Sequence, residues 1–96
     1  MQVAMVEFAV GPDKVDACVA ALRDITGNLV ALQPAFHGAT VHVEKATGTV
    51  INYMLWDTHE DFINFRDSNV ERIGEVLGEF GPKGRMIDVV AEIPKK

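Results

Sequence analysis

The chain has 96 residues, of which 48% are hydrophobic and 24% are charged, and its formal net charge is −5. This length allows one domain, residues 1–96, with the balance of a globular protein. The acidic charge argues against nucleic-acid binding, which needs clustered lysine and arginine, and the single cysteine excludes an intramolecular disulfide. No apolar stretch approaches 18 residues and no signal pattern precedes the first strand, so we expect no membrane association and a cytoplasmic location.

The first part of the chain predicts a strand and then a helix. Residues 3–10 form the strand, because their even positions make one apolar face. A Gly-Pro-Asp sequence at 11–13 begins the helix, since proline is tolerated in a first turn and aspartate is favourable near the positive end of the helix dipole. Apolar residues then recur at helical spacing up to Leu29, and Pro34 ends the pattern. Cys18 lies on this apolar stripe, and we interpret it as a core residue.

A hairpin follows, with predicted strands at 36–44 and 49–56 around a Lys-Ala-Thr-Gly loop whose glycine supplies the positive φ of a turn. Antiparallel pairing divides its side chains between the two faces of the sheet. One face carries Ala39, Val41, Val43, Val50, Asn52, Met54 and Trp56. The opposite face carries Thr40, His42, Glu44, Ile51, Tyr53 and Leu55.

The remaining sequence predicts a broken helix and a last strand. Residues 58–61 (Thr-His-Glu-Asp) are close to a capping box and begin a helix that buries Phe62 and Phe65. Residues 68–71 (Ser-Asn-Val-Glu) are a second such box, beginning a helix whose inward residues are Val70, Ile73, Val76, Leu77 and Phe80. Residues 86–93 form the last strand. The order predicts an α+β, ferredoxin-like domain: a four-stranded antiparallel sheet with helices on one face.

The two faces of this sheet predict two different roles. Helices cover only one face, and the other carries Ile51, Tyr53 and Leu55 beside His42, which is too apolar for water. Face-to-face packing of two sheets in a homodimer is the simplest remedy. We therefore interpret His42 and Tyr53 as interface residues.

The helix-covered face carries an amide and an indole, Asn52 and Trp56, roughly 13 Å apart along the strand. A buried amide costs about 1–3 kcal/mol if it is unpaired. Either the backbone satisfies Asn52 and Trp56 is a core residue, or a cleft between sheet and helices uses both. In the second interpretation Asn52 donates to a substrate oxygen and the indole N–H points at a carbonyl or at dioxygen. The predicted pocket is bounded by Asn52, Trp56 and Phe62, with an apolar wall of Phe8, Val41, Met54 and Phe65.

The segment from Val50 to Tyr53 (Val-Ile-Asn-Tyr), followed by Trp56-Asp57-Thr58 and then Phe62, resembles the antibiotic biosynthesis monooxygenase (ABM) superfamily. Residues 33–39 are similar to that family's Pro-Gly-Phe turn into the second strand, with Ala35 in place of the glycine. The resemblance implies a dimeric α/β barrel of ferredoxin-like subunits, and the superfamily includes cofactor-free, quinone-forming oxygenases.

In the quinone-forming branch, the resemblance places an asparagine and a tryptophan in the cleft, matching Asn52 and Trp56. That branch also has a tyrosine on the following helix, where this chain has Phe62 and so lacks the hydroxyl. The haem-degrading branch uses an asparagine in the first strand and a histidine in the second helical region. Neither is matched here, so we do not expect haem.

The activity that this resemblance implies is a cofactor-independent monooxygenase acting with dioxygen on a small aromatic phenol or anthrone-type substrate. No metal or other cofactor is expected. The candidate general bases are His37 and His59, and the position of His59 near a helix N-terminus favours its neutral form. The alternative for His59 is an exposed polar residue in a capping segment. Arg66 could balance an anionic substrate or pair with Asp67 or Glu71. The alternative is a non-catalytic ligand-binding or protective dimer, or an isomerase, on the same scaffold.

Overall fold

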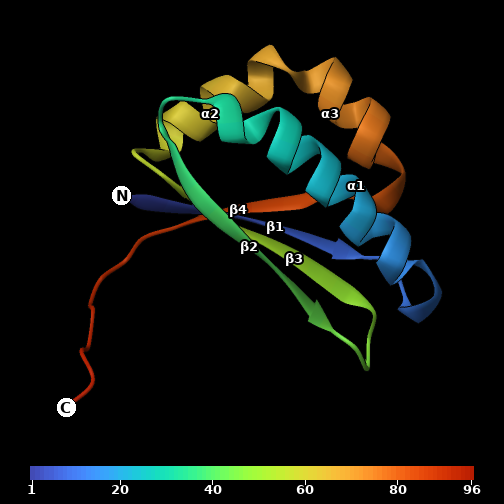
Figure 1. The fold of residues 1–96 in the computed structure, drawn as a ribbon, viewed down its shortest axis with the longest axis horizontal. Coiled ribbons are helices and arrows are strands. Elements are labelled where there is room, and N and C mark those ends of the chain that lie inside the picture. Colours follow the sequence, from blue (N-terminus) through green and yellow to red (C-terminus); the bar gives the residue numbers. More distant parts are fainter.

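The computed structural model describes residues 1–96. Four strands form one antiparallel sheet in the order β2-β3-β1-β4, and three helices cover one of its faces (Figure 1). The elements are β1 (Gln2–Ala9), α1 (Val15–Asn28), β2 (Phe36–Glu44), β3 (Thr49–Trp56), α2 (His59–Ser68), α3 (Val70–Leu77) and β4 (Lys83–Ile87), with short 3₁₀ turns at Pro12–Lys14, Val30–Leu32 and Gly78–Phe80. The predicted α+β, ferredoxin-like fold is confirmed.

The central hairpin has the predicted strands and the predicted pairing. Val41 pairs with Asn52 and Ala39 with Met54, which places these residues on one face of the sheet. The register shifts by one residue at His37, where the strand begins. Gly48 closes the hairpin loop with φ 69°, the left-handed conformation that glycine adopts without a steric cost.

Local signals set the ends of the helices. The Thr58 hydroxyl accepts the backbone N–H of Asp61 (3.1 Å), so the predicted cap of α2 is present. The helix α1 begins at Val15, after a 3₁₀ turn that contains the proline. It ends at Asn28, six residues before Pro34, which had been predicted to stop it.

The second predicted capping box is wrong. Ser68 is the last residue of α2, and Asn69, which precedes α3, makes no side-chain cap. The Asn69 amide instead donates to the Phe65 carbonyl of the preceding turn (2.8 Å), so it ends one helix rather than beginning the next. Val70 was predicted to face inward but is 65% exposed, because this break turns the start of α3 away from the sheet.

The predicted last strand at 86–93 is also wrong in its extent. The strand β4 begins at Lys83 and ends at Ile87, which pairs with Val3 near the start of β1. The ladder between β1 and β4 runs from Glu7 and Lys83 to Val3 and Ile87 and does not continue past Ile87. Residues 88–96 leave the sheet as an exposed tail, visible at the red end of the chain in Figure 1.

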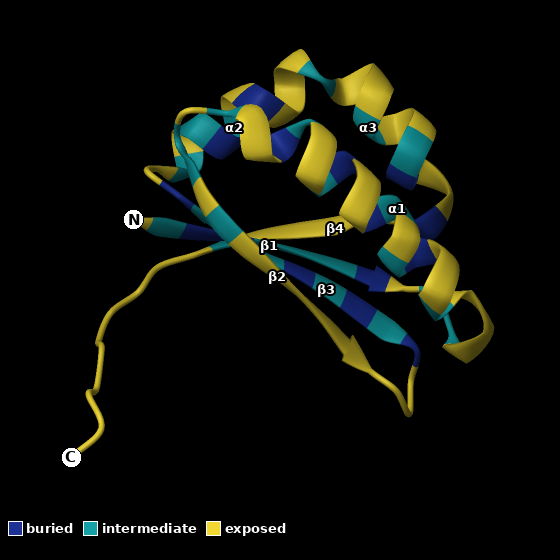
Figure 2. Cartoon of the chain, in the orientation of Figure 1, coloured by how far each residue is buried: buried dark blue, intermediate teal, exposed yellow.

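The core consists of two separate clusters beneath the helices. One contains Phe8, Cys18, Leu22, Ile25, Val50, Leu77 and Phe80. The other contains Ala4, Val30, Met54, Trp56, Phe62 and Phe65. Figure 2 shows these buried positions on β1, β3 and the inner sides of the helices, while the edge strands are largely exposed. Cys18 belongs to the first cluster, where burial raises the pKa of its thiol. None of the helices combines the length and the apolar character needed to cross a bilayer.

Candidate functional site

A cavity of about 250 Å³ separates the two clusters of the core. Both clusters contribute to its apolar wall: Phe8, Leu22, Ile25 and Leu77 from the first, and Val30, Met54, Phe62 and Phe65 from the second. Three polar side chains also line it, Thr26, Asn52 and Arg66. An apolar cavity with a few convergent polar groups is the usual form of a small-molecule site.

The floor of the cavity is one row of residues that runs across the middle of the sheet. Asn52 of β3 pairs with Val6 of β1, which in turn pairs with Gly84 of β4. All three line the cavity. Val41, the partner of Asn52 on β2, shares this face but does not line the cavity and is 37% exposed, because β2 is the edge strand beyond β3. Its predicted place in the wall is therefore wrong.

Asn52 is buried, with 4% of its surface exposed, and its amide is only partly satisfied. The Nδ2 group donates to the Thr26 hydroxyl of α1 over 3.4 Å, and Oδ1 has no hydrogen-bond partner. The interpretation in which the backbone satisfies this amide is therefore not what the structure contains. An unpaired buried acceptor costs about 1–3 kcal/mol, which an apolar side chain at this position would avoid.

Trp56 lies outside the cavity lining, although it was predicted to bound the pocket. The rings of Phe36, Phe62 and Phe65 surround it at centroid distances of 5.5, 5.7 and 5.6 Å. Its indole N–H is buried and has no acceptor. Because Phe62 and Phe65 also form part of the cavity wall, Trp56 supports that wall from behind.

Neither candidate base lines the cavity. His37, at the register shift of β2, pairs with the Asp57 carboxylate just after β3 (2.5 Å). Nε2 of His59 lies 3.1 Å from the Val3 carbonyl and 3.0 Å from the Ile87 carbonyl, and its backbone N–H donates to the Gln2 side chain (2.5 Å). His59 therefore joins α2 to the ends of β1 and β4, which is a structural role.

Of the ten predicted site residues, the structure gathers six around the cavity: Phe8, Asn52, Met54, Phe62, Phe65 and Arg66. Thr26 was not predicted to be part of the site. It is a polar residue on the apolar stripe of α1, between Ile25 and Leu29. A polar residue among apolar ones on a covered face is also the pattern that indicated Asn52. No three histidine, cysteine, aspartate or glutamate side chains gather into a potential metal site.

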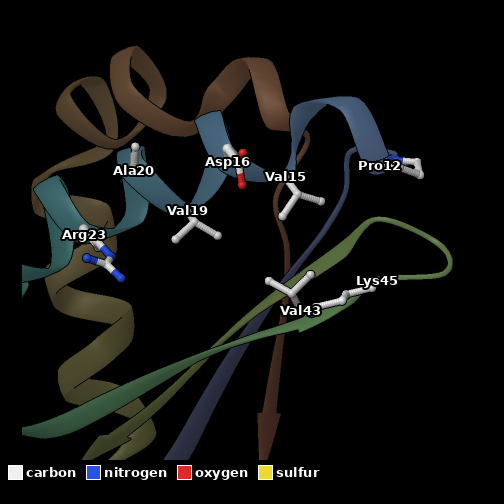
Figure 3. A pocket seen from close by; sticks show the side chains of 8 residues that line it. All are labelled: Pro12, Val15, Asp16, Val19, Ala20, Arg23, Val43 and Lys45. Carbon is white, nitrogen blue, oxygen red and sulfur yellow. The ribbon is translucent and has the colours of Figure 1, made fainter.

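A larger hollow, of about 580 Å³, lies between α1 and the end of β2. Figure 3 shows Val15 and Val19 of α1 pointing toward Val43, with Arg23 and Lys45 at either side. This hollow is more open than the cavity, and no buried polar group without a partner lines it. We therefore assign the candidate site to the smaller cavity.

The comparisons with known proteins agree with this fold. A monooxygenase from the gene ActVA-Orf6 of Streptomyces coelicolor, solved with the ligand Nanaomycin D, is 24% identical with a TM-score of 0.75, and the match covers 99% of this chain and 92% of that one. A proposed antibiotic biosynthesis monooxygenase from Deinococcus radiodurans is 11% identical with a TM-score of 0.77, over 100% and 99% of the two chains. No curated protein sequence matches. The family model "Antibiotic biosynthesis monooxygenase" matches residues 1–71, and the chain belongs to this family.

Proposed function

We propose that the protein is a cofactor-independent monooxygenase that oxidises a small aromatic phenol or anthrone-type substrate with dioxygen. The observation that carries the proposal is a buried amide, Asn52, kept with an unpaired oxygen in the wall of an apolar cavity. Membership of the monooxygenase family supports the reaction class. A residue that served only the core would be apolar here, because an apolar side chain avoids the desolvation cost of the amide.

The cavity volume limits the size of the substrate. An engineered cavity of about 150 Å³ binds benzene, and sites for drug-sized ligands begin near 300 Å³. A volume of about 250 Å³ therefore encloses one or two fused aromatic rings, and the third ring of an anthrone would extend to the exposed side of the cavity. Phe62 and Phe65 offer ring faces and edges for stacking, and Met54 fills the wall between them and the sheet.

The chemistry needs no group beyond the substrate and dioxygen. An electron-rich phenol or anthrone reduces dioxygen once it is deprotonated. The ring C–H or methylene group becomes a carbonyl, one oxygen atom enters the new C=O, and the other leaves as water with two hydrogens from the substrate. The Asn52 amide provides two contacts in this dry site: Oδ1 can accept from the substrate hydroxyl, and the second N–H of Nδ2 can donate to the substrate oxygen once it is ionised. Arg66 lies at the solvent side of the cavity.

This site differs from the quinone-forming branch in the groups that could remove the substrate proton. Phe62 lacks the hydroxyl of the family's tyrosine, and Arg66 is the one ionisable side chain in the lining. We therefore propose that the proton passes to water or buffer, which restricts turnover to substrates that ionise near neutral pH. The same observations favour the second candidate function, a ligand-binding or protective dimer without turnover.

Oxygen consumption with a panel of anthrones and hydroquinones tests this proposal. Asn52→Leu is expected to reduce turnover by about a hundredfold, because the polar contact to the substrate oxygen is lost. It is also expected to raise the free energy of unfolding by about 1 kcal/mol, because the unpaired buried amide is gone.

Trp56→Phe, which removes only the indole N–H and part of the ring, reports whether that donor takes part. Val41→Leu, on the same face of the sheet but outside the cavity lining, serves as the control, with turnover within about threefold of wild type. If the wild type turns over no member of the panel, the binding function replaces the enzyme. If Asn52→Leu matches the wild type on every substrate, the site assignment is wrong.

We further propose that the protein is a homodimer that packs through the uncovered face of the sheet. Ile51, Tyr53 and Leu55 remain half-buried on this face in the single chain, and the Tyr53 ring meets His42 edge to face at 6.4 Å. The exposed tail carries further apolar residues, with Val90 93% and Ile93 91% exposed. A second copy is the simplest cover for these surfaces.

Light scattering tests the assembly and is expected to give twice the chain mass of 10.5 kDa. Leu55→Arg is expected to shift the population to monomer, because it places a charge in the seam. Ala20→Arg, on the exposed side of α1, is the matched control and leaves the mass unchanged. A wild-type mass of 10.5 kDa at every concentration would refute the dimer.

A further inference from the structure

The cavity has one solvent-exposed side. Of the 15 residues that line it, 12 are buried or half-buried, and the three exposed ones are Arg66, Pro82 and Gly84. Arg66 lies on α2, while Pro82 precedes β4 and Gly84 is the second residue of β4, an edge strand of the sheet. The cavity therefore opens between α2 and this edge of the sheet.

Gly84 keeps that opening free of side chains. It pairs with Val6, and because Val6 faces the cavity, a side chain at position 84 would point the same way. A Cβ atom placed there meets no heavy atom within 4 Å, so the position faces open space. The backbone at Gly84 does not have a positive φ, so its conformation does not demand glycine.

Arg66 is the only charged residue that lines the cavity. Its Nε group donates to the neighbouring Asp67 carboxylate over 3.3 Å, and the terminal guanidinium nitrogens make no hydrogen bond. No carboxylate lines the cavity. The other nearby arginine, Arg85, follows Gly84 along the strand and points to the opposite face, where it binds Glu7 (2.6 Å).

We propose that Gly84 and Arg66 form the entrance and select the ligand: an aromatic compound that passes over Gly84 and binds with an anionic substituent on the Arg66 guanidinium. The ligand class is a hydroxylated aromatic acid of one or two rings, with its ring system in the apolar cavity. The planar guanidinium suits a carboxylate, which it can bind through two parallel hydrogen bonds. The inference rests on the proposed function for the location of the site.

Binding measured without oxygen tests the selection by charge. The probes are hydroxynaphthoic acid and naphthol, which differ in the carboxylate, and calorimetry gives the two affinities. The acid is expected to bind at least about tenfold more tightly, since hydrogen bonds to charged groups are the stronger ones. Arg66→Gln is expected to abolish this preference. Arg72→Gln, an exposed arginine of α3 that is outside the cavity lining, is the control and retains it.

The entrance itself is tested by filling it. Gly84→Val is expected to slow the association of both probes at least about tenfold, while Gly84→Ala has a smaller effect in the same direction. Equal affinity of the two probes for the wild type, an unchanged preference in Arg66→Gln, or unchanged association rates in Gly84→Val would each overturn the inference.

The binding experiments and the oxygen-consumption assay can fail independently of each other. Tight, Arg66-dependent binding of the acid by a protein that consumes no oxygen supports the entrance and removes the monooxygenase function. Oxygen consumption without any preference for the acid supports the monooxygenase function and contradicts the proposed entrance.

Discussion

Replacing Trp56 by alanine is expected to lower the free energy of unfolding by about 3–5 kcal/mol, the range for large aromatic residues removed from a packed core. Trp56 is 1% exposed and contacts three phenylalanine rings. For a domain of this size the melting temperature is expected to fall by roughly 15 °C or more. Urea titration and thermal melting followed by circular dichroism measure both quantities, since this substitution removes the only tryptophan as a fluorescent probe.

The control for this change is Trp56→Phe, which keeps an aromatic ring among the three phenylalanines and removes the buried N–H that has no acceptor. It is expected to cost about 1–2 kcal/mol, because the cavity left behind is small and a desolvated donor is removed. A loss below about 1 kcal/mol for the alanine variant would contradict the tight packing of this cluster.

The comparison of these two variants also decides how Trp56 affects function. Phe62 and Phe65 line the cavity on one side and contact Trp56 on the other. The alanine variant therefore loosens the cavity wall, and a loss of binding in it reports packing. Only a loss in the phenylalanine variant reports the indole N–H. The family resemblance gives Trp56 a place in the cleft, whereas its position in the structure gives it contact with the wall of the site.

The parts of the fold that the sequence predicts correctly are those determined by local signals. The strands at 36–44 and 49–56 agree in every residue, because alternating side chains and a glycine turn act over a few positions. The cap at Thr58 is equally local. The end of β4 is a tertiary property, because it depends on how far β4 pairs along β1. The local sequence pattern therefore predicts a strand that continues to residue 93, six residues beyond its observed end at Ile87.

The candidate site divides in the same way. Periodicity places Asn52, Met54 and Trp56 on the covered face, and the structure agrees. The set of residues that lines the cavity, however, depends on how the three helices pack against the sheet. That arrangement leaves Trp56 within an aromatic cluster and Val41 partly exposed outside the cavity. The role of His59 is also tertiary, because the carbonyls that it contacts belong to residues 56 and 28 positions away.

The second substitution that we expect to lower the free energy of unfolding strongly is Gly48→Ala, in the hairpin loop between β2 and β3. The Gly48 carbonyl accepts the backbone N–H groups of Val10 (3.2 Å) and Gly11 (3.1 Å), so this glycine fastens the hairpin to the connection between β1 and α1. A Cβ atom there would lie 2.1 Å from the carbonyl carbon of Gly11 and 2.3 Å from the nitrogen of Pro12. Both are backbone atoms that cannot rotate away.

We expect Gly48→Ala to lower the free energy of unfolding by about 3 kcal/mol or more. The positive φ alone costs an alanine about 1–2 kcal/mol, and separating the two backbone segments adds the loss of their hydrogen bonds. Urea denaturation measures the change. Gly27→Ala is the matched control: it lies inside α1 with no heavy atom within 4 Å of the added Cβ, and it is expected to gain up to about 1 kcal/mol from helix propensity. Equal midpoints for the two variants would show that the loop tolerates a side chain, and the close contact with residues 11 and 12 would then not constrain the fold.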